Sequence, residues 1–595
     1  MDLPAVLDLA AVRALYAAGA SPRELLAALA ERTDGADPAV FITRTPPAMI
    51  AKAVDSLLAR APVPNSLPLW GVPYAVKDNI DVAGLPTTCA CPAFARVPAN
   101  DAAVVAKLAA AGALVVGKTN LDQFATGLNG TRSPHGAPRS VFSAEHVSGG
   151  SSSGSAVAVA AGLASFALGT DTAGSGRVPA AFNNLVGIKP TPGLVSTRGV
   201  IPACASLDCV SVFALSVADG LAVRRVAEGY DPADPWSRRA ALRTLPGKGL
   251  RIGVLGREDR VLCGAEANAR LYDEAIHRCG ATTIEIEYAP FREVASLLYE
   301  GPWVAERRAA FDSFGIGEAD LDPSVRAIFA RAERFSAADA FRAQHRLAAL
   351  RRACEAEMAK ADALLLPTAS RGFTVAEMLA EPIARNAELG LYTNFCNLLG
   401  LAAIAIPAGF APDGLPFGVT LVGPAFSDDA LAPLADTLHR AARSGAGRDR
   451  GTAIAPLPGT KPADDRIELA VVGAHLSGMP LNHELRALDG RLVERARTAS
   501  AYRLFVLPGT VPAKPGLLRA AGSPGPGIEL EVWSLEADAF GRFVAAIPPP
   551  LGVGKIELAD GRRVSGFLCE SWAVAGARDI TDCGSWRHFV ASAMP

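Results

Sequence analysis

The sequence predicts an α/β protein with two domains. The larger domain is expected to contain a mixed, mostly parallel β-sheet covered by helices, and the smaller C-terminal domain to be β-rich (α+β). Three observations support this prediction. At 595 residues the chain is too long for one hydrophobic core. Apolar runs typical of buried strands alternate with helical patterns in residues 1–443. A segment rich in glycine, proline and charge then precedes further short strand-like runs.

Apolar spacing predicts the elements of the first domain. Residues 7–60 are expected to be helical, because Ser21-Pro22-Arg23-Glu24 has the pattern of a capped helix start and precedes an apolar-periodic run. Further helices are predicted over 102–111 and over the alanine-rich stretch 155–164. Strands are predicted over residues 69–76, 114–117, 165–169, 251–255, 363–366, 402–406 and 418–422.

Glycine, proline and charged residues dominate residues 444–465, which predicts a linker. The predicted domains are therefore residues 1–443 and residues 466–595. Turns such as Asp560-Gly561 separate apolar runs in the second domain, as in antiparallel β-structure. Its strands are expected over residues 467–473, 502–507, 528–535 and 563–570.

Composition argues against several classes of function. Half of the residues are apolar and the formal net charge is −2, so nothing favours a nucleic-acid partner. The ten cysteines form no Cys-x-x-Cys pair and no metal-like spacing with histidine, which predicts no metal site and suits a reducing cytoplasm. The N-terminus lacks a basic region followed by an apolar core, so no signal peptide is expected. No apolar run reaches about 18 residues, so we expect a cytoplasmic protein without a membrane span.

Two Ser/Gly-rich loops and one lysine form the candidate catalytic centre. Ser151 lies in the first loop, residues 148–155, and Ser175 ends the second, residues 169–175. Lys77 follows the apolar segment Pro73-Tyr74-Ala75-Val76. A serine activated by a neutral lysine is a variant of the nucleophile–base arrangement that needs no histidine.

This chemistry requires an uncharged lysine. Burial in an apolar pocket lowers the pKa of a lysine, because it penalises the ammonium form. A second serine can relay the proton, since a hydroxyl both donates and accepts. The loop Thr172-Ala173-Gly174-Ser175 can direct successive N–H groups to one point, as an oxyanion hole requires.

Two other interpretations of these segments are weaker. A Ser/Gly run is often only a flexible linker, but here a predicted helix, a predicted strand and a second Ser/Gly turn follow it directly. Residues 112–119 fit the spacing of a phosphate-binding loop that ends in Lys118-Thr119. Their inner residues are apolar and strand-forming, whereas a phosphate cradle needs a small, flexible loop. We therefore favour the serine interpretation.

The two loops closely resemble the amidase signature family, and the resemblance extends over roughly residues 1–440. It rests on residues 149–156, 167–181 and 187–191, which follow the family signature almost without a break. It implies that Ser175 is the nucleophile and that Ser151 is a bridging serine on a cis peptide after Gly150. Lys77 is then implied to be the ultimate base.

The same resemblance implies roles for the second loop. Asp171 and Arg177 would brace it. Ala173 and Ser153 stand where glycine is commoner in the family, but backbone donors survive a substitution to alanine. The oxyanion hole is implied to be formed by the N–H groups of Thr172, Ala173 and Gly174.

Residues 297–307 resemble the allophanate hydrolase branch of the family. Tyr299 and Arg307 are close to two helical turns apart and can face one pocket if Gly301-Pro302 permits. An arginine fork suits a small planar carboxylate, and tyrosine offers a hydroxyl to a polar substrate. Composition alone favours a surface arginine and a core tyrosine, whereas the resemblance implies that both bind substrate.

Residues 472–482 and 497–504 resemble the C-terminal domain of allophanate hydrolases. More loosely, they resemble γ-glutamyl cyclotransferase-like barrels, in which a strand-to-loop turn binds a carboxylate. The resemblance implies that this domain helps to decarboxylate the product of the first, with His475 as the candidate for proton transfer. A buried structural histidine is an equally open interpretation. Lys514 and Arg519 are further candidate anion contacts.

The resemblance implies hydrolysis of allophanate (urea-1-carboxylate) to ammonia and N-carboxycarbamate during urea degradation. It implies no cofactor, a homodimer, and a functional link to a urea carboxylase. That carboxylase is expected to be a separate protein, because the chain lacks an Ala-Met-Lys-Met biotin motif. Two alternatives stay open at this point. One is another amidase, such as the amidase component of a glutamyl-tRNA amidotransferase, and the other is a non-catalytic scaffold that recruits partners through its second domain.

Overall fold

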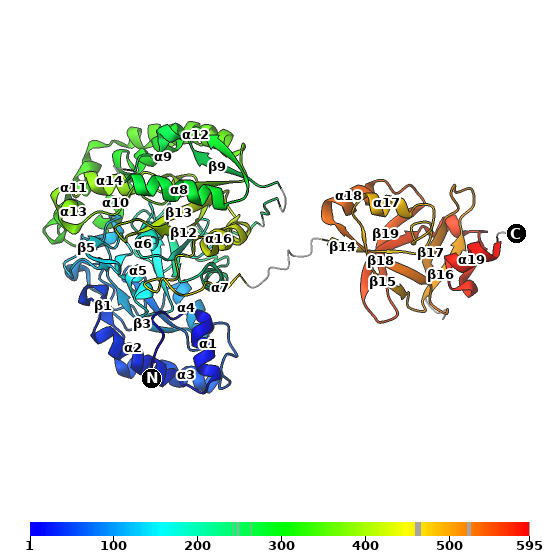
Figure 1. Ribbon diagram of the computed structural model, residues 1–595, viewed down its shortest axis with the longest axis horizontal. Coiled ribbons are helices and arrows are strands. Elements are labelled where there is room, and N and C mark those ends of the chain that lie inside the picture. Colours follow the sequence, from blue (N-terminus) through cyan, green and yellow to red (C-terminus); the bar gives the residue numbers. More distant parts are fainter. Residues whose placement is uncertain (242, 247–248, 263–264, 458–465, 521–524, 594–595) are drawn as a thin grey trace. The chain divides into compact units, whose positions relative to one another are not determined.

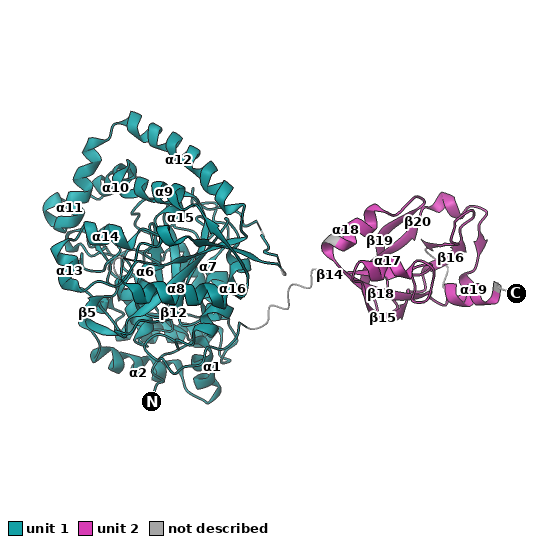
Figure 2. Ribbon diagram, turned by 45° about the horizontal axis from the view of Figure 1, so that its top comes forward, with its two compact units in different colours: residues 1–458 teal, residues 459–595 magenta. Residues whose placement is uncertain are grey.

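The computed structural model describes the chain except for residues 242, 247–248, 263–264, 458–465, 521–524 and 594–595. The chain divides into two compact units, Met1–Pro458 and Gly459–Pro595 (Figure 2). Each unit has its own buried apolar core. The two units are therefore described separately.

An eleven-stranded sheet forms the centre of the first unit, with the strand order β1-β3-β2-β6-β8-β7-β12-β13-β11-β9-β10 (Figure 1). A separate pair, β4 (Arg139–Ser140) and β5 (Ser143–Val147), lies outside it. The bounds of the sheet strands are β1 Phe41–Arg44, β2 Pro73–Lys77, β3 Leu114–Thr119, β6 Phe166–Asp171, β7 Val186–Lys189, β8 Cys209–Ala214, β9 Arg251–Leu255, β10 Thr282–Ile286, β11 Ala363–Pro367, β12 Ala402–Phe410 and β13 Pro416–Gly423.

The sheet is mixed, but the prediction that it is mostly parallel is wrong. Parallel pairing is confined to two groups of strands, β3-β2-β6 and β11-β9-β10. The strands between them, from β6 through β8, β7, β12 and β13 to β11, pair antiparallel. The sequence pattern did not reveal β7 and β8, which add antiparallel neighbours without the crossover helix that parallel strands need.

Helices pack around the sheet of the first unit. In Figure 1, α1 to α3 lie at one end of this unit, and α9 to α12 lie at the opposite end. Helix α2 begins with the predicted cap, in which Ser21 and Glu24 exchange side-chain and backbone hydrogen bonds. The bounds are α1 Leu9–Ala17, α2 Pro22–Asp34, α3 Pro47–Arg60, α4 Ala103–Ala110, α5 Ser153–Ala160, α6 Val178–Phe182, α7 Val217–Ala227, α8 Glu266–Arg278, α9 Ala289–Glu300, α10 Trp303–Asp312, α11 Pro323–Ala330, α12 Ala337–Met358, α13 Val375–Ala380, α14 Ala384–Leu389, α15 Phe395–Leu398 and α16 Asp428–Ala442.

Helix α5 positions the first Ser/Gly loop. Every residue of this helix is buried, and all of them are Ser, Gly, Ala or Val. Small side chains are required here, because a Cβ at Gly154 would lie 2.3 Å from the carbonyl oxygen of Val40. The loop that leads into α5 is thereby held within the core of the first unit.

The second unit contains a five-stranded sheet, β15-β18-β14-β20-β19, and a three-stranded sheet, β17-β16-β21. Its strands are β14 Arg466–Val471, β15 Arg491–Arg497, β16 Tyr502–Val506, β17 Pro515–Arg519, β18 Glu529–Glu536, β19 Leu551–Glu557, β20 Arg563–Cys569 and β21 Arg578–Asp579. Its helices are α17 Asn482–Ala487, α18 Ala537–Ala545 and α19 Trp586–Ala593. This unit is β-rich, as the sequence predicts.

Part of the segment expected to be a linker packs on the first unit. The N–H of Gly447 donates to the carbonyl of Asn184 (3.0 Å), and the N–H of Arg448 donates to that of Ala160 (3.0 Å). Residues 458–465 of the same segment lie outside the described residues. Within the described part of the chain, each helix is too short or too polar to cross a lipid bilayer.

A buried ion pair braces the loop that follows β6. The Nε of Arg177 donates to Oδ2 of Asp171 (2.9 Å), and its Nη2 donates to Oδ1 (3.0 Å). Both side chains are fully buried. Arg177 also donates to the carbonyl of Thr393 (3.1 Å), which ties this loop to the segment before α15.

Replacing Arg177 with methionine should destabilise the first unit strongly. The substitution leaves the carboxylate of Asp171 buried without its counter-charge, a change that lowers the free energy of unfolding by about 3–5 kcal/mol in comparable cases. Urea unfolding followed by circular dichroism measures it. Arg342→Met, which removes an exposed pair with Asp339, is the control and should unfold like the parent protein. Equal unfolding midpoints for the two variants would contradict the prediction.

Candidate active site

Lys77, Ser151 and Ser175 form a continuous hydrogen-bonded chain. Lys77 Nζ lies 2.7 Å from Ser151 Oγ, and Ser151 Oγ lies 2.9 Å from Ser175 Oγ. Lys77 and Ser151 are fully buried, and Ser175 is 2% exposed. The structure thus brings together the three residues that the sequence predicts as the catalytic centre.

Two parallel strands hold Lys77 in place. Lys77 is the last residue of β2, and the neighbouring strand β6 carries Thr170. Lys77 Nζ donates to Thr170 Oγ1 (2.7 Å), which also accepts a hydrogen bond from the amide of Asn79 (3.3 Å). Because Thr170 occupies one direction around Nζ, the amine is oriented toward Ser151.

Burial makes Lys77 a usable base near neutral pH. Loss of water around the ammonium lowers the pKa of Lys77 from 10.5 to about 7, while the charges of Asp122, Asp208 and Asp171 act in the opposite direction. A large fraction of Lys77 is therefore uncharged at pH 7, and an uncharged amine can accept a proton from Ser151.

The loop before α5 requires glycine where it meets a neighbouring loop. The peptide bond between Gly150 and Ser151 is cis. A Cβ at Gly150 would lie 2.2 Å from Oδ2 of Asp122 and 2.5 Å from the backbone nitrogen of Gly130. Only glycine therefore fits at position 150, next to the bridging hydroxyl.

The loop after β6 presents unused backbone donors beside Ser175. The N–H groups of Thr172, Ala173 and Gly174 have no acceptor within the described part of the chain. A Cβ at Gly174 would lie 2.3 Å from Oγ1 of Thr393, so glycine is needed there as well. Ala173 is buried in the core, where its methyl group is accommodated. The loop can therefore offer several N–H groups to a developing negative charge.

Sequence reasoning missed Asp122, which organises the loop that faces the serines. Its carboxylate accepts hydrogen bonds from the N–H groups of Asn129 (3.2 Å), Gly130 (3.1 Å) and Arg132 (3.1 Å). Its own N–H donates to the carbonyl of Ser151 (3.0 Å). Burial raises the pKa of Asp122. A polar residue just after the predicted strand end at 117 was the available signal.

Asp208 is a second functional residue that sequence reasoning missed. Its carboxylate accepts the hydroxyl of Thr172 and the N–H groups of Ala203 (2.8 Å) and Cys204 (3.1 Å). Burial raises the pKa of Asp208. It therefore fixes the side chain of the first residue of the oxyanion loop.

Tyr299 and Arg307 meet beside the same site. Tyr299 lies near the end of α9 and Arg307 on α10, and Cζ of Arg307 lies 5.1 Å from the centre of the tyrosine ring. Arg307 is 2% exposed, and its Nη1 donates to Thr126 Oγ1 (3.4 Å). The next residue, Gly127, accepts a hydrogen bond from Ser175 Oγ (3.3 Å). Arg307 is thus one residue removed from a direct contact of the nucleophile.

Arg307 and Tyr299 also carry polar atoms without partners. The Nε and Nη2 atoms of Arg307 and the hydroxyl of Tyr299 are buried and make no hydrogen bond among the described residues. Buried guanidinium donors are normally paired, so these atoms have the character of a vacant anion site.

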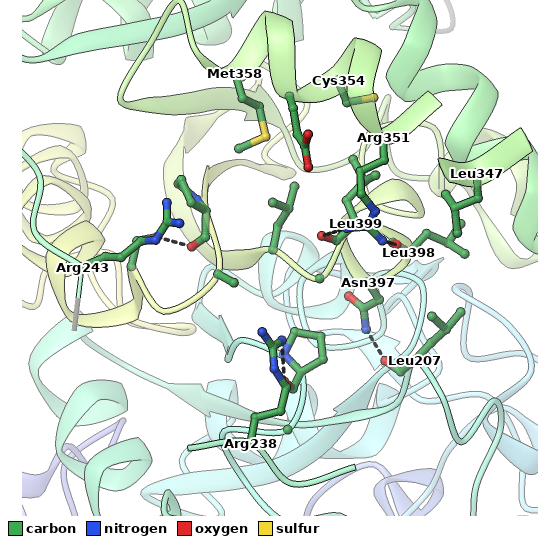
Figure 3. Close-up of a pocket in the computed structure, with 18 of the residues that line it drawn as sticks. Leu207, Arg238, Arg243, Leu347, Arg351, Cys354, Met358, Asn397, Leu398 and Leu399 are labelled. Atoms are coloured by element: carbon green, nitrogen blue, oxygen red, sulfur yellow. Dashed lines mark hydrogen bonds between the residues drawn. The ribbon is translucent and has the colours of Figure 1, made fainter. Parts of the chain in front are cut away.

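A cavity of about 1120 Å³ reaches the back of this site. Asp208 and Asn397 line it, whereas neither catalytic serine does. Figure 3 shows Asn397 donating to the carbonyl of Leu207 (2.7 Å). The same amide donates to the carbonyl of Asp171 (2.7 Å), so this cavity adjoins the support of the oxyanion loop, not the reacting hydroxyls.

The remaining predicted site residue, His475, belongs to the second unit and follows β14. Its Nε2 lies 2.8 Å from Oε2 of Glu484, and its ring stacks on Phe567. Burial lowers the pKa of His475. His475 is described apart from the Lys77 site because the two units are not placed relative to each other.

The phosphate-loop interpretation is excluded by the strand β3. Lys118 lies on this strand, is fully buried and forms an ion pair with Asp78 (2.9 Å). The structure also places no group of three or more His, Cys, Asp or Glu side chains around a common metal position within its described ranges. Nine cysteines are described, and all nine are free thiols.

Two protein families match separate parts of the chain. The amidase family matches residues 24–432, and the family described as the allophanate hydrolase C-terminal domain matches residues 467–591. Together these matches cover both compact units.

Individual relatives agree with this division. A urea amidolyase of Saccharomyces cerevisiae is 45% identical over 546 residues, which is 88% of this chain but 30% of that protein, so the chain spans about a third of its length. The amidase component of a Synechococcus glutamyl-tRNA(Gln) amidotransferase is 34% identical over 73% of this chain and 96% of its own length. The crystal structure of Kluyveromyces lactis allophanate hydrolase superposes with a TM-score of 0.79 and 39% identity, covering 99% of this chain and 100% of that one. The chain is therefore a member of the amidase family.

Proposed function

We propose that this enzyme hydrolyses allophanate through Ser175 and releases ammonia as the first product. The observation that carries the proposal is the buried, hydrogen-bonded series Lys77–Ser151–Ser175. The match of the second unit to an allophanate hydrolase domain supports this substrate over the other amides that the family hydrolyses.

The reaction begins with proton transfer along the series. Neutral Lys77 accepts the proton of Ser151, Ser151 accepts that of Ser175, and Ser175 Oγ attacks the terminal amide carbonyl. The oxygen that becomes negatively charged is stabilised by the N–H groups of Thr172, Ala173 and Gly174. The proton returns through Ser151 to the nitrogen that leaves as ammonia, and water then releases N-carboxycarbamate from Ser175.

Substrate choice is assigned to Arg307 and Tyr299. Allophanate carries a carboxylate one amide away from the scissile bond, and the unpartnered atoms of Arg307 can hold it by two parallel hydrogen bonds. The Tyr299 hydroxyl can bond to the remaining polar atoms. The amidase component of a glutamyl-tRNA amidotransferase is the alternative, and only the first unit resembles it.

The second unit is proposed to help decarboxylate N-carboxycarbamate, with His475 in proton transfer. A γ-glutamyl cyclotransferase-like fold for this unit, and domain limits of 1–443 and 466–595 around a linker, belong to the same proposal. So do a cytoplasmic homodimer and a functional link to a urea carboxylase. The free thiols of the described cysteines are compatible with a reducing compartment.

Removing the nucleophile should abolish ammonia release from allophanate. Ser175→Ala eliminates the attacking oxygen while leaving the surrounding core in place, so the rate should fall by at least about 10³-fold. A coupled ammonia assay measures the loss, and circular dichroism checks the fold. Ser165→Ala serves as the control, because Ser165 is equally buried and its hydroxyl has no partner among the described residues. Substantial turnover of allophanate by Ser175→Ala would refute the proposed mechanism.

The rate should increase with pH as Lys77 loses its proton. Because burial lowers the pKa of Lys77 to about 7, the active free base is the minor form below this value and the major form above it. We expect kcat/KM for allophanate to rise through pH 7 and then level off. Lys77→Arg stays charged at every accessible pH and should be inactive throughout. A parent profile that is flat across neutral pH would argue against a lysine base.

Arg307 should matter for anionic substrates alone. Arg307→Met is expected to lower kcat/KM for allophanate by about 10–100-fold, mainly through a higher KM, since a charge-assisted hydrogen bond is lost. Biuret, in which an amide replaces the carboxylate, should lose much less. The control is Arg308→Met, because Arg308 pairs with Asp312 and Glu318. Equal losses for both substrates would show that Arg307 does not recognise the carboxylate.

A further inference from the structure

The second unit contains a cavity of about 310 Å³ that no catalytic serine lines. An apolar cavity with a few convergent polar groups is the usual form of a small-molecule site. Three of its lining residues are ionisable: His475, Glu484 and Lys514. Its apolar walls include Leu481, Phe543, Ile547, Leu551 and Phe567.

His475 is held in one orientation within this cavity. Its ring stacks on Phe567 at 5.3 Å with an interplanar angle of 10°, and meets the edge of Phe543 at 5.1 Å. Its Nε2 is engaged with Glu484 (2.8 Å). A fixed imidazole with one engaged nitrogen is suited to moving a proton at the other nitrogen, Nδ1.

The main chain of Lys514 is fixed next to the turn that precedes His475. Its N–H donates to Thr510 Oγ1 (2.9 Å), and its carbonyl accepts from the N–H of Leu507 (3.1 Å). The following residue, Pro515, packs so closely that a Cβ at Gly473 would lie 2.3 Å from its Cδ. The positive charge of Lys514 contributes to the lowered pKa of His475. No carboxylate pairs with the Lys514 ammonium in the described ranges of the chain.

The turn after β14 adds backbone donors. Its carbonyls are engaged: that of Ala474 accepts from the N–H of Leu481 (2.8 Å), and that of His475 accepts from the amide of Asn482 (2.8 Å). In contrast, the N–H groups of Gly473, Ala474 and His475 have no acceptor among the residues that the structure describes. One ammonium and several free N–H groups therefore border the same cavity, which is an arrangement suited to a carboxylate.

From these contacts we propose that Lys514 is the anion-binding residue of this cavity and that the cavity takes a small dicarboxylate. The identity of that dicarboxylate as N-carboxycarbamate rests on the proposed function. One carboxylate binds Lys514 and the N–H groups of the turn. The second carboxylate then faces the apolar wall.

This placement accounts for which carboxylate leaves. Transfer of one proton to the central nitrogen and cleavage of one C–N bond convert the dianion into carbamate and carbon dioxide. A carboxylate against an apolar wall is poorly solvated, whereas neutral carbon dioxide is not penalised there. The charge of the bound dianion raises the proton affinity of His475, which supplies the proton. The carboxylate at Lys514 is retained as carbamate.

The test compares Lys514→Met, Lys514→Arg and the control Lys555→Met in the full chain, with ¹³C-labelled allophanate followed by NMR. Lys555 lies on β19, bonds to Ser565 and does not line the cavity. We expect Lys514→Met to raise the amount of N-carboxycarbamate per ammonia released by at least about tenfold. Lys514→Arg should restore most of the parent ratio, and Lys555→Met should match it. An unchanged ratio in Lys514→Met overturns the proposal.

Calorimetric titration with malonate provides a second measurement that needs no turnover. Malonate carries two carboxylates at the same spacing but has no C–N bond to break. In an Arg307→Met background, which removes the expected anion contact of the first unit, adding Lys514→Met should weaken malonate binding by about tenfold or more. Equal affinity overturns the proposal. If the parent chain releases no ammonia from allophanate, the proposed substrate fails, and the malonate titration still decides whether Lys514 binds a dicarboxylate.

Discussion

The structure of the first unit depends on keeping one lysine dry and in contact with a serine hydroxyl. Water around Lys77 would restore its charge and remove the base, so the amine has to be enclosed by protein on every side. The parallel pairing of β2 with β6 achieves this, because it places Thr170 against the amine within the sheet. The carboxylates around the site act against this effect, and their pairing with arginine or backbone N–H groups limits their influence.

Enclosure also explains why the site is built from small residues. Ser151 and Ser175 come from loops that have to approach each other through a packed core. The close contacts of Gly150 with Asp122, of Gly154 with Val40 and of Gly174 with Thr393 leave no room for a Cβ. The alanine-rich composition of α5 follows from the same constraint, since a larger side chain would displace the strands that hold Lys77.

Local patterns in the sequence predicted those parts of the fold that local physics determines. Capping at Ser21, apolar strands such as 363–366 and the division into two units all have short-range signals. The antiparallel centre of the sheet was not predictable in this way. Strand β8 pairs with β6 and β7, and this choice of neighbours depends on the whole fold. The same limit applies to the site. Lys77 and the two serines stand in distinctive segments, and the structure joins them as predicted. Asp122 and Asp208 act through hydrogen bonds to backbone groups of other loops, and no periodicity marks such a role. Arg307 was found through resemblance, since an arginine on a helix carries no local sign of whether it faces solvent or a buried pocket.

The vacant donors of Arg307 have a consequence for the free enzyme. A guanidinium that has given up water without gaining acceptors is locally frustrated, and this frustration persists for as long as the pocket is empty. An arriving carboxylate relieves it, so part of the affinity originates in the unfavourable state of the unoccupied protein. A neutral competitor would leave that state unchanged. Selectivity for anions is therefore already present in the resting fold before any ligand arrives.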